Sequence, residues 1–386
     1  MTWMLASVVG PDEAELALAG GADIIDFKDP TQGALGAVAP EVVRAGVLRI
    51  GQRKPSSAVL GNIPTTPDAL LPAIGEMAKT GVHYLKLGIF PDFPAESAIK
   101  SLAGVAHEIK LIAVFFADQH PDLSLLPLLA ECGFAGTMLD TSDKSSGHLL
   151  DYFDIPQLSR FTEECRRLHL LMGLAGGLEL PDIPRLLLLD PVLLGFRTAL
   201  CGHQGRNGTI DLQSAKKVRA LIPILEKNHT GVDYHLLAAR GYGPDMPDDP
   251  ALTDRVYLRD FVLPMQIGVY AREQNLLQKV RFNVEVTITR TRRVASDLVD
   301  VFSYDVISDT IRMLADAGHV GLVETLAERI AERLLHHPRL VKVRVQVEKL
   351  ETKSGIVGIA IERDHVADDL ATSLCLRETE RLGARS

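Results

Sequence analysis

The chain is poor in cysteine and in positive charge. Four cysteines stand far apart among 386 residues, without a CxxC pair, which favours reduced thiols in a cytosolic protein over a disulfide framework or a zinc site. The formal net charge of -9 argues against a nucleic-acid or anionic-membrane surface. The chain also lacks a signal-peptide pattern and an uncharged apolar run long enough to span a bilayer. We therefore expect a soluble, cytoplasmic protein without nucleic-acid or membrane partners.

Metal-binding patterns are lacking as well. The 12 histidines show no HxH or HExxH spacing, so neither a metal nor another cofactor is predicted.

Short apolar runs alternate with helical patterns from the start of the chain to about residue 225. Eight such runs favour a (β/α)8 barrel over a doubly wound open sheet, which would show the same alternation. This first domain is predicted to span residues 1–227. The expected strands are 3–8, 22–27, 56–60, 84–88, 110–116, 136–139, 170–174 and 193–196.

The pattern changes after residue 227. Residues 228–253 are rich in Gly, Pro and Asp, which is typical of a linker. Residues 254–366 then predict a small α+β domain, and residues 367–386 a polar tail. In that domain the expected strands are 255–263, 279–290, 341–348 and 355–362, with helices at 303–317 and 320–336 between the second and third strands.

Charged residues cluster where the even-numbered strands of the predicted barrel end. Asp26 and Lys28 close the second strand, Lys86 lies late in the fourth, and Asp140 ends the sixth with Lys144 in the following loop. Barrel enzymes carry their chemistry at these strand ends. A lysine in an apolar barrel mouth loses hydration, so its pKa falls and its amine becomes a nucleophile. The pattern suits Schiff-base aldol chemistry, although lysines solvated at the protein surface would produce the same sequence pattern.

Two glycine-rich loops follow the seventh and eighth predicted strands, LAGGLE and CGHQGRNGTID. Backbone amides in such loops at a helix N-terminus suit phosphate. An ordinary tight turn is the alternative for the Asn-Gly pair.

The segments GGADIIDFKDPTQGALGA, YLKLGIF, MLDTSDKSSG, LAGGLE, GFRTALC and GRNGTID resemble the motifs of (5-formylfuran-3-yl)methyl phosphate synthase, a barrel enzyme of methanofuran biosynthesis. The resemblance covers about residues 3–222. It implies condensation of two molecules of glyceraldehyde 3-phosphate into a phosphorylated furan aldehyde.

By this resemblance Lys28 would form the Schiff base and Lys86 would be the main proton acceptor. Asp26, Asp140 and Lys144 would support them. The residues implied near the substrate phosphate are Arg197, Arg206, Gly176, Gly177, Asn207 and Asp211. The chain departs from the family at Asn62, where an acidic residue is usual, and this puts the rate or exact product in question.

In the second domain, IGVYAREQN with Glu273, Tyr304, Glu324 and Lys349 resembles dihydroneopterin aldolase, a tunnel-fold enzyme, over about residues 254–363. Taken singly, Glu324 would be an ordinary acid of a first helical turn and Glu273 an exposed loop charge. The resemblance implies that Glu324 binds the amino-pyrimidine edge of a pterin and that Val323 also contacts the substrate.

The same resemblance implies that Lys349 moves protons during a retro-aldol cleavage without Schiff base or metal. Glu273 would hold the side-chain hydroxyls of the substrate, and Tyr304 would act across a subunit boundary, so a homo-oligomer is expected. Leu350 replaces the usual Pro after the lysine.

The sequence thus predicts a bifunctional enzyme acting on glyceraldehyde 3-phosphate and dihydroneopterin. Two alternatives stay open. The second domain is only an oligomerisation module, or the barrel is a simple aldolase or isomerase of triose phosphates.

Overall fold

The computed structural model describes residues 2–61, 67–90, 94–143, 146–222, 252–270, 273, 276–290, 298–337, 339–352 and 355–364. The chain divides into two compact units, Met1–Asn228 and His229–Ser386. The predicted linker, except for residues 252–253, and the whole predicted tail lie outside the described residues, so these boundaries stay predictions. Within the described ranges, no helix is both long enough and apolar enough to cross a bilayer.

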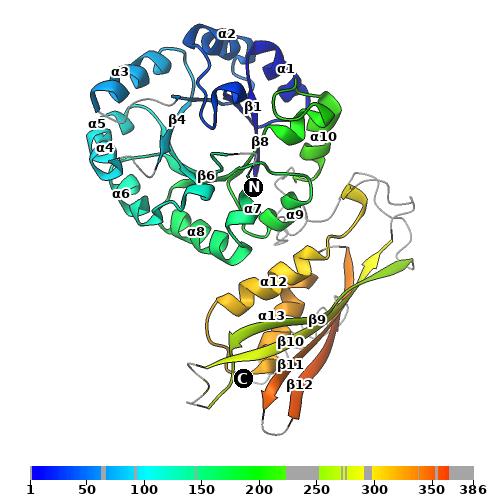
Figure 1. The fold of residues 1–386 in the computed structure, drawn as a ribbon. Helices are drawn as coiled ribbons and strands as arrows, with labels where there is room; N and C mark the ends of the chain where they lie inside the picture. The colour runs from blue at the N-terminus through cyan, green and yellow to red at the C-terminus, as the bar shows by residue number, and fades with distance from the viewer. Residues whose placement is uncertain are drawn as a thin grey trace, which may run out of the picture. The chain divides into compact units, whose positions relative to one another are not determined.

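The first unit is a closed barrel of parallel strands that pair in sequence order from β1 to β8, surrounded by helices (Figure 1). This confirms the predicted (β/α)8 fold. The strands are β1 (Trp3–Val8), β2 (Ile24–Phe27), β3 (Ser56–Val59), β4 (Tyr84–Ile89), β5 (Leu111–Phe116), β6 (Gly136–Asp140), β7 (Leu171–Leu174) and β8 (Leu193–Phe196).

Local sequence signals set several helix starts of this unit. Pro11 and Pro40 occupy the first turns of their helices, where the missing N–H costs nothing. Asp154 and Gln157 form a reciprocal capping box at another helix. The helices are α1 (Pro11–Ala19), α2 (Pro40–Ile50), α3 (Pro67–Ala78), α4 (Ala95–Ser101), α5 (Ala103–Ala106), α6 (Leu126–Glu131), α7 (Leu149–Tyr152), α8 (Ile155–Arg167), α9 (Asp182–Leu187) and α10 (Leu212–Ala220).

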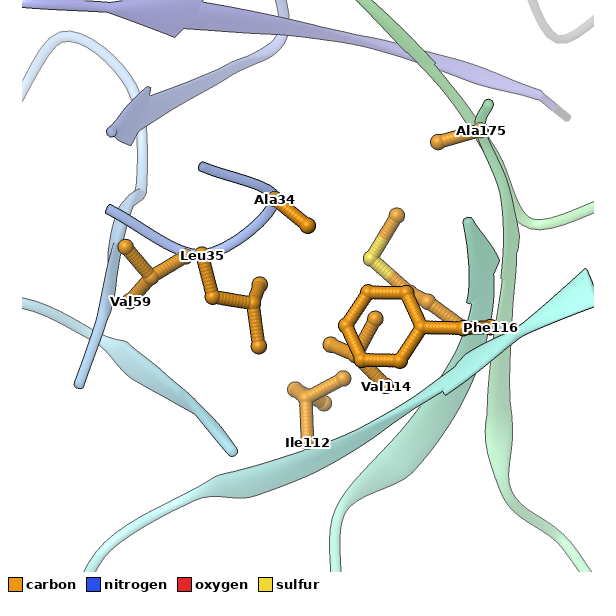
Figure 2. Packing of buried hydrophobic residues seen from close by; sticks show 8 residues of the cluster. Ala34, Leu35, Val59, Ile112, Val114, Phe116 and Ala175 are labelled. Carbon is orange, nitrogen blue, oxygen red and sulfur yellow. The ribbon is translucent and has the colours of Figure 1, made fainter. Parts of the chain in front are cut away.

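The barrel interior is bulky on one side. Ile112, Val114 and Phe116 of β5 and Leu35 from the segment after β2 converge in Figure 2. All six residues of β5 are buried, because one face of the strand points into the barrel and the other meets the helices. The ring of Phe116 also stacks on Phe90, with centroids 4.6 Å apart.

The barrel carries small residues on the side of β7 and β8, namely Gly173, Ala175 and Gly195. A Cβ atom at Gly173 would lie 2.6 Å from Leu193 Cδ1, and one at Gly195 would lie 3.0 Å from Ala175 Cβ. Neighbouring side chains therefore use the space that these glycines leave, and the cavity described below borders Ala175 and Gly195.

The second unit is a four-stranded antiparallel sheet in the order β12-β11-β10-β9. Its helices pack on one face: α13 lies against β11 and β12, and α12 against β9. The elements are β9 (Thr253–Gln266), β10 (Leu277–Thr289), α12 (Asp305–Asp316), α13 (Val323–Leu335), β11 (Leu340–Thr352) and β12 (Gly355–Asp364). The predicted order of two strands, two helices and two strands is confirmed.

Candidate active sites

Four predicted residues meet at the C-terminal end of the barrel strands. Asp26 is in β2 and Lys28 directly follows it, Lys86 is in β4, and Asp140 ends β6. Lys28 Nζ lies 3.0 Å from Asp140 Oδ2, and Lys86 Nζ lies 2.8 Å from Asp26 Oδ1. The four residues are only 1–8% exposed. Alternate strands of a barrel contribute side chains to the same interior layer, which explains the meeting.

Two serines hold Asp26 in place. The strand register sets Ser7 of β1 and Ser57 of β3 on either side of Asp26. The hydroxyl of Ser57 donates to Asp26 Oδ1 at 2.5 Å, and that of Ser7 donates to Oδ2 at 3.2 Å. The carboxylate thus has partners for both oxygens. Neither serine was predicted from the sequence, although inward-facing polar positions level with Asp26 would have indicated them.

The two lysines differ in their electrostatic setting. Burial lowers the pKa of Lys86 below its ordinary value, and the nearby charge of Lys28 acts in the same direction. The charges of Asp26 and Asp140 oppose this shift. The lowered pKa expected for a barrel lysine is therefore found at Lys86, which can accept a proton as a neutral amine. Lys28 instead makes a buried ion pair with Asp140.

The loop after β6 is tied to the loop after β5. Asp118 accepts bonds from the amide and hydroxyl of Ser142, at 2.7 and 2.5 Å, and from the amide of Asp143 at 2.8 Å. Asp140 Oδ1 accepts from the Thr141 amide at 2.8 Å. Asp118 was not predicted from the sequence. The predicted Lys144 and the departure at Asn62 lie outside the described residues.

A cleft of about 660 Å3, including solvent at its mouth, opens over these groups. Gly176 and Gly177 border it with φ angles of 117° and 65°, which favour glycine. The carbonyl of Gly176 accepts a bond from the Leu149 amide at 2.8 Å, which fixes the loop. Other residues on the wall of the cleft are Ser7, Asp26, Lys28, Lys86, Asp140, Arg197 and Arg206.

The two predicted arginines differ in what they can offer a phosphate. All five N–H donors of the Arg197 guanidinium are used within the protein, by Glu13 and by the carbonyls of Ser7, Arg206 and Gly208. Arg206 is half-buried and donates from Nη2 to the carbonyl of Gly33 at 3.0 Å. Of the two, Arg206 is the one with donors to spare, so a direct phosphate contact from Arg197 does not fit this arrangement.

Asn207 and Asp211 do not belong to the wall of the cleft. Asn207 is exposed, and the carboxylate of Asp211 caps α10 by accepting from the Ser214 amide at 2.7 Å. The hydrogen bonds from Ser214 lower the pKa of Asp211. The structure thus gives Asp211 a capping role, in contrast to the predicted contact with substrate.

In the second unit, Glu273 and Lys349 form a half-buried pair. Lys349 Nζ donates to Glu273 Oε1 at 2.5 Å and to the Ile267 carbonyl at 3.3 Å. Gln278, which the sequence analysis missed, donates to the same two acceptors. The hydrogen bond from Lys349, with a further one from the Tyr270 amide, lowers the pKa of Glu273. This arrangement fixes an amine next to a carboxylate.

The other predicted residues of this unit lie at helix starts. Val323 and Glu324 open α13 three and four residues after Val320, which pairs with Ile267 beside the Glu273–Lys349 pair. Glu324 is exposed, and Tyr304, which precedes α12, is 63% exposed. The structure brings Glu273 and Lys349 together and leaves Tyr304 on the surface.

The closed barrel, with charged side chains gathered at the C-terminal ends of its strands, defines the first unit as a (β/α)8 enzyme domain. A second α+β domain follows it.

Comparison with known proteins identifies both units. Residues 4–219 match the model of the 4-HFC-P synthase family, and the chain belongs to this family. Residues 256–362 match the dihydroneopterin aldolase family model. Both resemblances noted in the sequence are thereby confirmed.

Three relatives illustrate the similarity. A Methylorubrum extorquens protein, provisionally named (5-formylfuran-3-yl)methyl phosphate synthase, is 43% identical over 54% of this chain and 86% of its own length. The (5-formylfuran-3-yl)methyl phosphate synthase of Methanosarcina mazei is 32% identical over 52% of this chain and 90% of its own. The crystal structure of E. coli dihydroneopterin aldolase in complex with neopterin has 32% identity and a TM-score of 0.27, and covers 28% of this chain and 98% of its own.

Proposed function

We propose that the barrel condenses two molecules of glyceraldehyde 3-phosphate to (5-formylfuran-3-yl)methyl phosphate through a Schiff base on Lys28. One phosphate and two waters leave, which balances the atoms of substrates and product. The family match and the names of the relatives support this reaction. It would supply the furan of a methanofuran-type cofactor.

The contacts of Lys28 support its role as nucleophile. Its Nζ lies 3.0 Å from Asp140 Oδ2, so the carboxylate can take the proton that the ammonium must lose before it attacks the aldehyde. The carbinolamine formed by this attack then loses water to give the Schiff base. The ion pair of Lys28 with Asp140 is the observation that carries the proposal.

Lys86 has the setting of a proton acceptor. Formation of the Schiff base acidifies the hydrogen on the neighbouring carbon, and the neutral form of Lys86 can take it to leave an enamine. Burial favours that neutral form, and Asp26 keeps the amine 2.8 Å away at a fixed position. The enamine then adds to the carbonyl carbon of the second triose phosphate.

Reductive trapping tests the nucleophile. The full chain is incubated with glyceraldehyde 3-phosphate and borohydride, and the modified peptide is located by mass spectrometry. We expect added mass at Lys28 and none in Lys28→Ala. Lys28→Arg is the matched control, because it keeps a positive charge beside Asp140 without forming a Schiff base. Labelling that survives both substitutions would place the nucleophile elsewhere, with Lys86 next to be examined.

We propose in addition that the second unit cleaves 7,8-dihydroneopterin, or a close stereoisomer, to 6-hydroxymethyl-7,8-dihydropterin and glycolaldehyde. Lys349 would move protons, Glu273 would hold the side-chain hydroxyls, and Glu324 with Val323 would bind the pterin. The family match and the 2.5 Å contact between Glu273 and Lys349 support this proposal. Tyr304 would act across a subunit boundary of a homo-oligomer, which fits its exposure on the single chain.

Substitutions made in one unit at a time test whether each unit carries out its own reaction in the full chain. Lys349→Ala should abolish glycolaldehyde release from dihydroneopterin and leave furan phosphate formation unchanged. Lys28→Arg should do the reverse. If the parent protein releases no glycolaldehyde although it forms furan phosphate, the second unit is an assembly module. A different product from glyceraldehyde 3-phosphate alone would make the barrel a simpler aldolase or isomerase.

A further inference from the structure

Arg197, directly after β8, and Glu13 of α1 form a buried cross-link at the barrel mouth. Arg197 Nη1 lies 2.6 Å from Glu13 Oε2, and Nη2 lies 3.2 Å from Oε1. The remaining guanidinium donors bond the carbonyls of Ser7, Arg206 and Gly208, at 3.1, 3.0 and 2.7 Å. The two side chains are only 10% and 8% exposed. A charge pair enclosed in this way holds its surroundings in one arrangement, because a misplaced partner would leave a buried charge without compensation.

Glu13 completes the cross-link from the side of α1. Its carboxylate also accepts from the amide of Val9 at 2.9 Å and from the amide of Ile210 at 3.3 Å. A first-turn acid of a helix is ordinarily exposed and serves the helix dipole, but Glu13 is 6% exposed. Its bonds lead instead to the loop after β1 and to the segment before α10.

Both segments adjoin or carry groups of the proposed site. The loop after β1 begins beyond Ser7, whose hydroxyl bonds Asp26. The segment before α10 carries Arg206, which borders the cleft and whose own carbonyl accepts from Arg197 Nε. The backbone of Arg206 is therefore fixed by Arg197, while its guanidinium retains donors for a ligand.

We infer that Glu13 and Arg197 are positioning residues that hold the Arg206 guanidinium at the cleft, where it binds the phosphate of the substrate. The inference rests on the proposed triose-phosphate chemistry of the barrel. Arg206 is the contact residue, because a guanidinium presents paired N–H groups that match phosphate oxygens. Glu13 acts on phosphate recognition only through Arg197 and the loop that this arginine holds.

Two aldehydes that differ only in the phosphate test this inference. The rate of reductive trapping at Lys28 is measured for glyceraldehyde 3-phosphate and for glyceraldehyde, at low substrate concentration. In Glu13→Gln we expect the rate with the phosphorylated aldehyde to fall about 100-fold, since a small displacement of a binding group has an effect of that order. The rate with glyceraldehyde should stay close to that of the parent protein.

A second buried pair gives the matched control. Asp23 and Arg219 form an ion pair with side chains 13% and 10% exposed, and Asp23 directly precedes β2 at the opposite end of the barrel. Asp23→Asn should destabilise the fold without discriminating between the two aldehydes. Where Glu13→Gln does not fold, Arg197→Lys breaks the same cross-link and keeps the charge.

A double variant tests whether Glu13 acts on phosphate recognition through Arg206 or independently of it. If Glu13 acts through Arg206, Glu13→Gln combined with Arg206→Ala should trap glyceraldehyde 3-phosphate no more slowly than Arg206→Ala alone. Additive losses, or equal losses with both aldehydes, would overturn the inference and leave the Schiff-base proposal intact. A parent protein that traps neither aldehyde at Lys28 would overturn the Schiff-base proposal and this inference with it.

Discussion

At the scale of single residues, the two barrel lysines share a cavity and differ in their partners. Lys28 is paired with Asp140 on β6, whereas Lys86 is paired with Asp26 on β2. Burial outweighs the pairing at Lys86, because its pKa is lowered in spite of the carboxylate. The lowered pKa favours the neutral amine of Lys86, which agrees with its proposed role as proton acceptor.

The lowered pKa of Lys86 predicts a pH dependence. The neutral amine exists above the pKa, so the rate of furan phosphate formation should rise with pH through a midpoint below 10.5, the ordinary lysine value. Because Asp26 favours the charged form of Lys86, Asp26→Asn should lower the pKa further and move the midpoint to lower pH. The pH–rate profile measures this shift.

Ser57→Ala is the control for this prediction. It removes the 2.5 Å hydrogen bond to Asp26 and leaves the charges of Asp26 and Lys86 in place. Its midpoint should stay near that of the parent protein. A midpoint that moves to higher pH in Asp26→Asn would contradict the assignment of Lys86 as the base.

The sequence was sufficient to predict the charged residues at the strand ends, but not the residues that hold them in place. Asp26, Lys86 and Asp140 could be placed because strand position alone sends them to the barrel mouth. Glu13 and Asp118 could not, because their roles depend on contacts between loops, at separations of 184 residues for Glu13 with Arg197 and 24 for Asp118 with Ser142. The same limit hid the difference between Arg197 and Arg206.

At the scale of elements, hydrophobic periodicity gave the strands of the barrel with small boundary errors. The bounds of β1 and β8 are those predicted, since each is a short buried run followed by a turn. β9 extends three residues beyond its predicted end at residue 263, to Gln266. This extension includes Pro264, and β9 is an edge strand of its sheet, where proline is tolerated.

The glycine loop after β7 provides a test at this scale. A Cβ atom at Gly176 would lie 3.1 Å from the Thr141 amide nitrogen and 3.4 Å from the Asp140 carbonyl carbon. With its φ angle of 117°, Gly176→Ala should lower the free energy of unfolding by about 1–3 kcal/mol. It should also reduce the condensation rate, because the crowding falls on the segment that carries Asp140.

Gly81→Ala is the matched control. Gly81 has a φ angle of 86°, and its added Cβ would meet only Val47 Cγ1, at an ordinary 3.6 Å. Denaturant unfolding should show a similar loss of stability in both variants, whereas the activity of Gly81→Ala should be retained. Equal activity in the two variants would remove the proposed link between Gly176 and Asp140.

At the scale of the whole molecule, the second unit exposes large apolar side chains and two edge strands. Large apolar side chains are exposed on it, among them Val269, Tyr270, Leu276 and Leu277 at 53–63%. β9 and β12 are edges of its sheet, and edge strands offer unpaired backbone groups to another chain. Isolated apolar exposure is normal, whereas contiguous apolar patches mark interaction sites. These features agree with the proposed homo-oligomer.

Mixed assemblies test whether Tyr304 acts across the subunit boundary. Tyr304→Phe and Lys349→Ala should each lack glycolaldehyde release alone. Co-expressed, they should regain about one quarter of the parent activity, because random assembly places intact Tyr304 and Lys349 from different chains in that share of the sites. Glycolaldehyde release from the purified mixture measures the recovery.

A second mixture provides the control. Glu273 and Lys349 touch within one chain, 2.5 Å apart, so Glu273→Gln mixed with Lys349→Ala leaves a defect in every site. This mixture should stay inactive. Recovery in both mixtures, or in neither, would show that Tyr304 does not complete the site of a neighbouring chain.

The uneven filling of the barrel also bears on redesign of the enzyme. The large side chains of β5 fill one part of the barrel interior, whereas the small residues Ala175 and Gly195 border the cleft. A larger side chain at Ala175, which borders the cleft, would therefore narrow the space for the proposed aldehyde substrate. Substitutions on β5 would instead loosen the scaffold. Substrate selectivity and stability can thus be altered at different positions of the barrel interior.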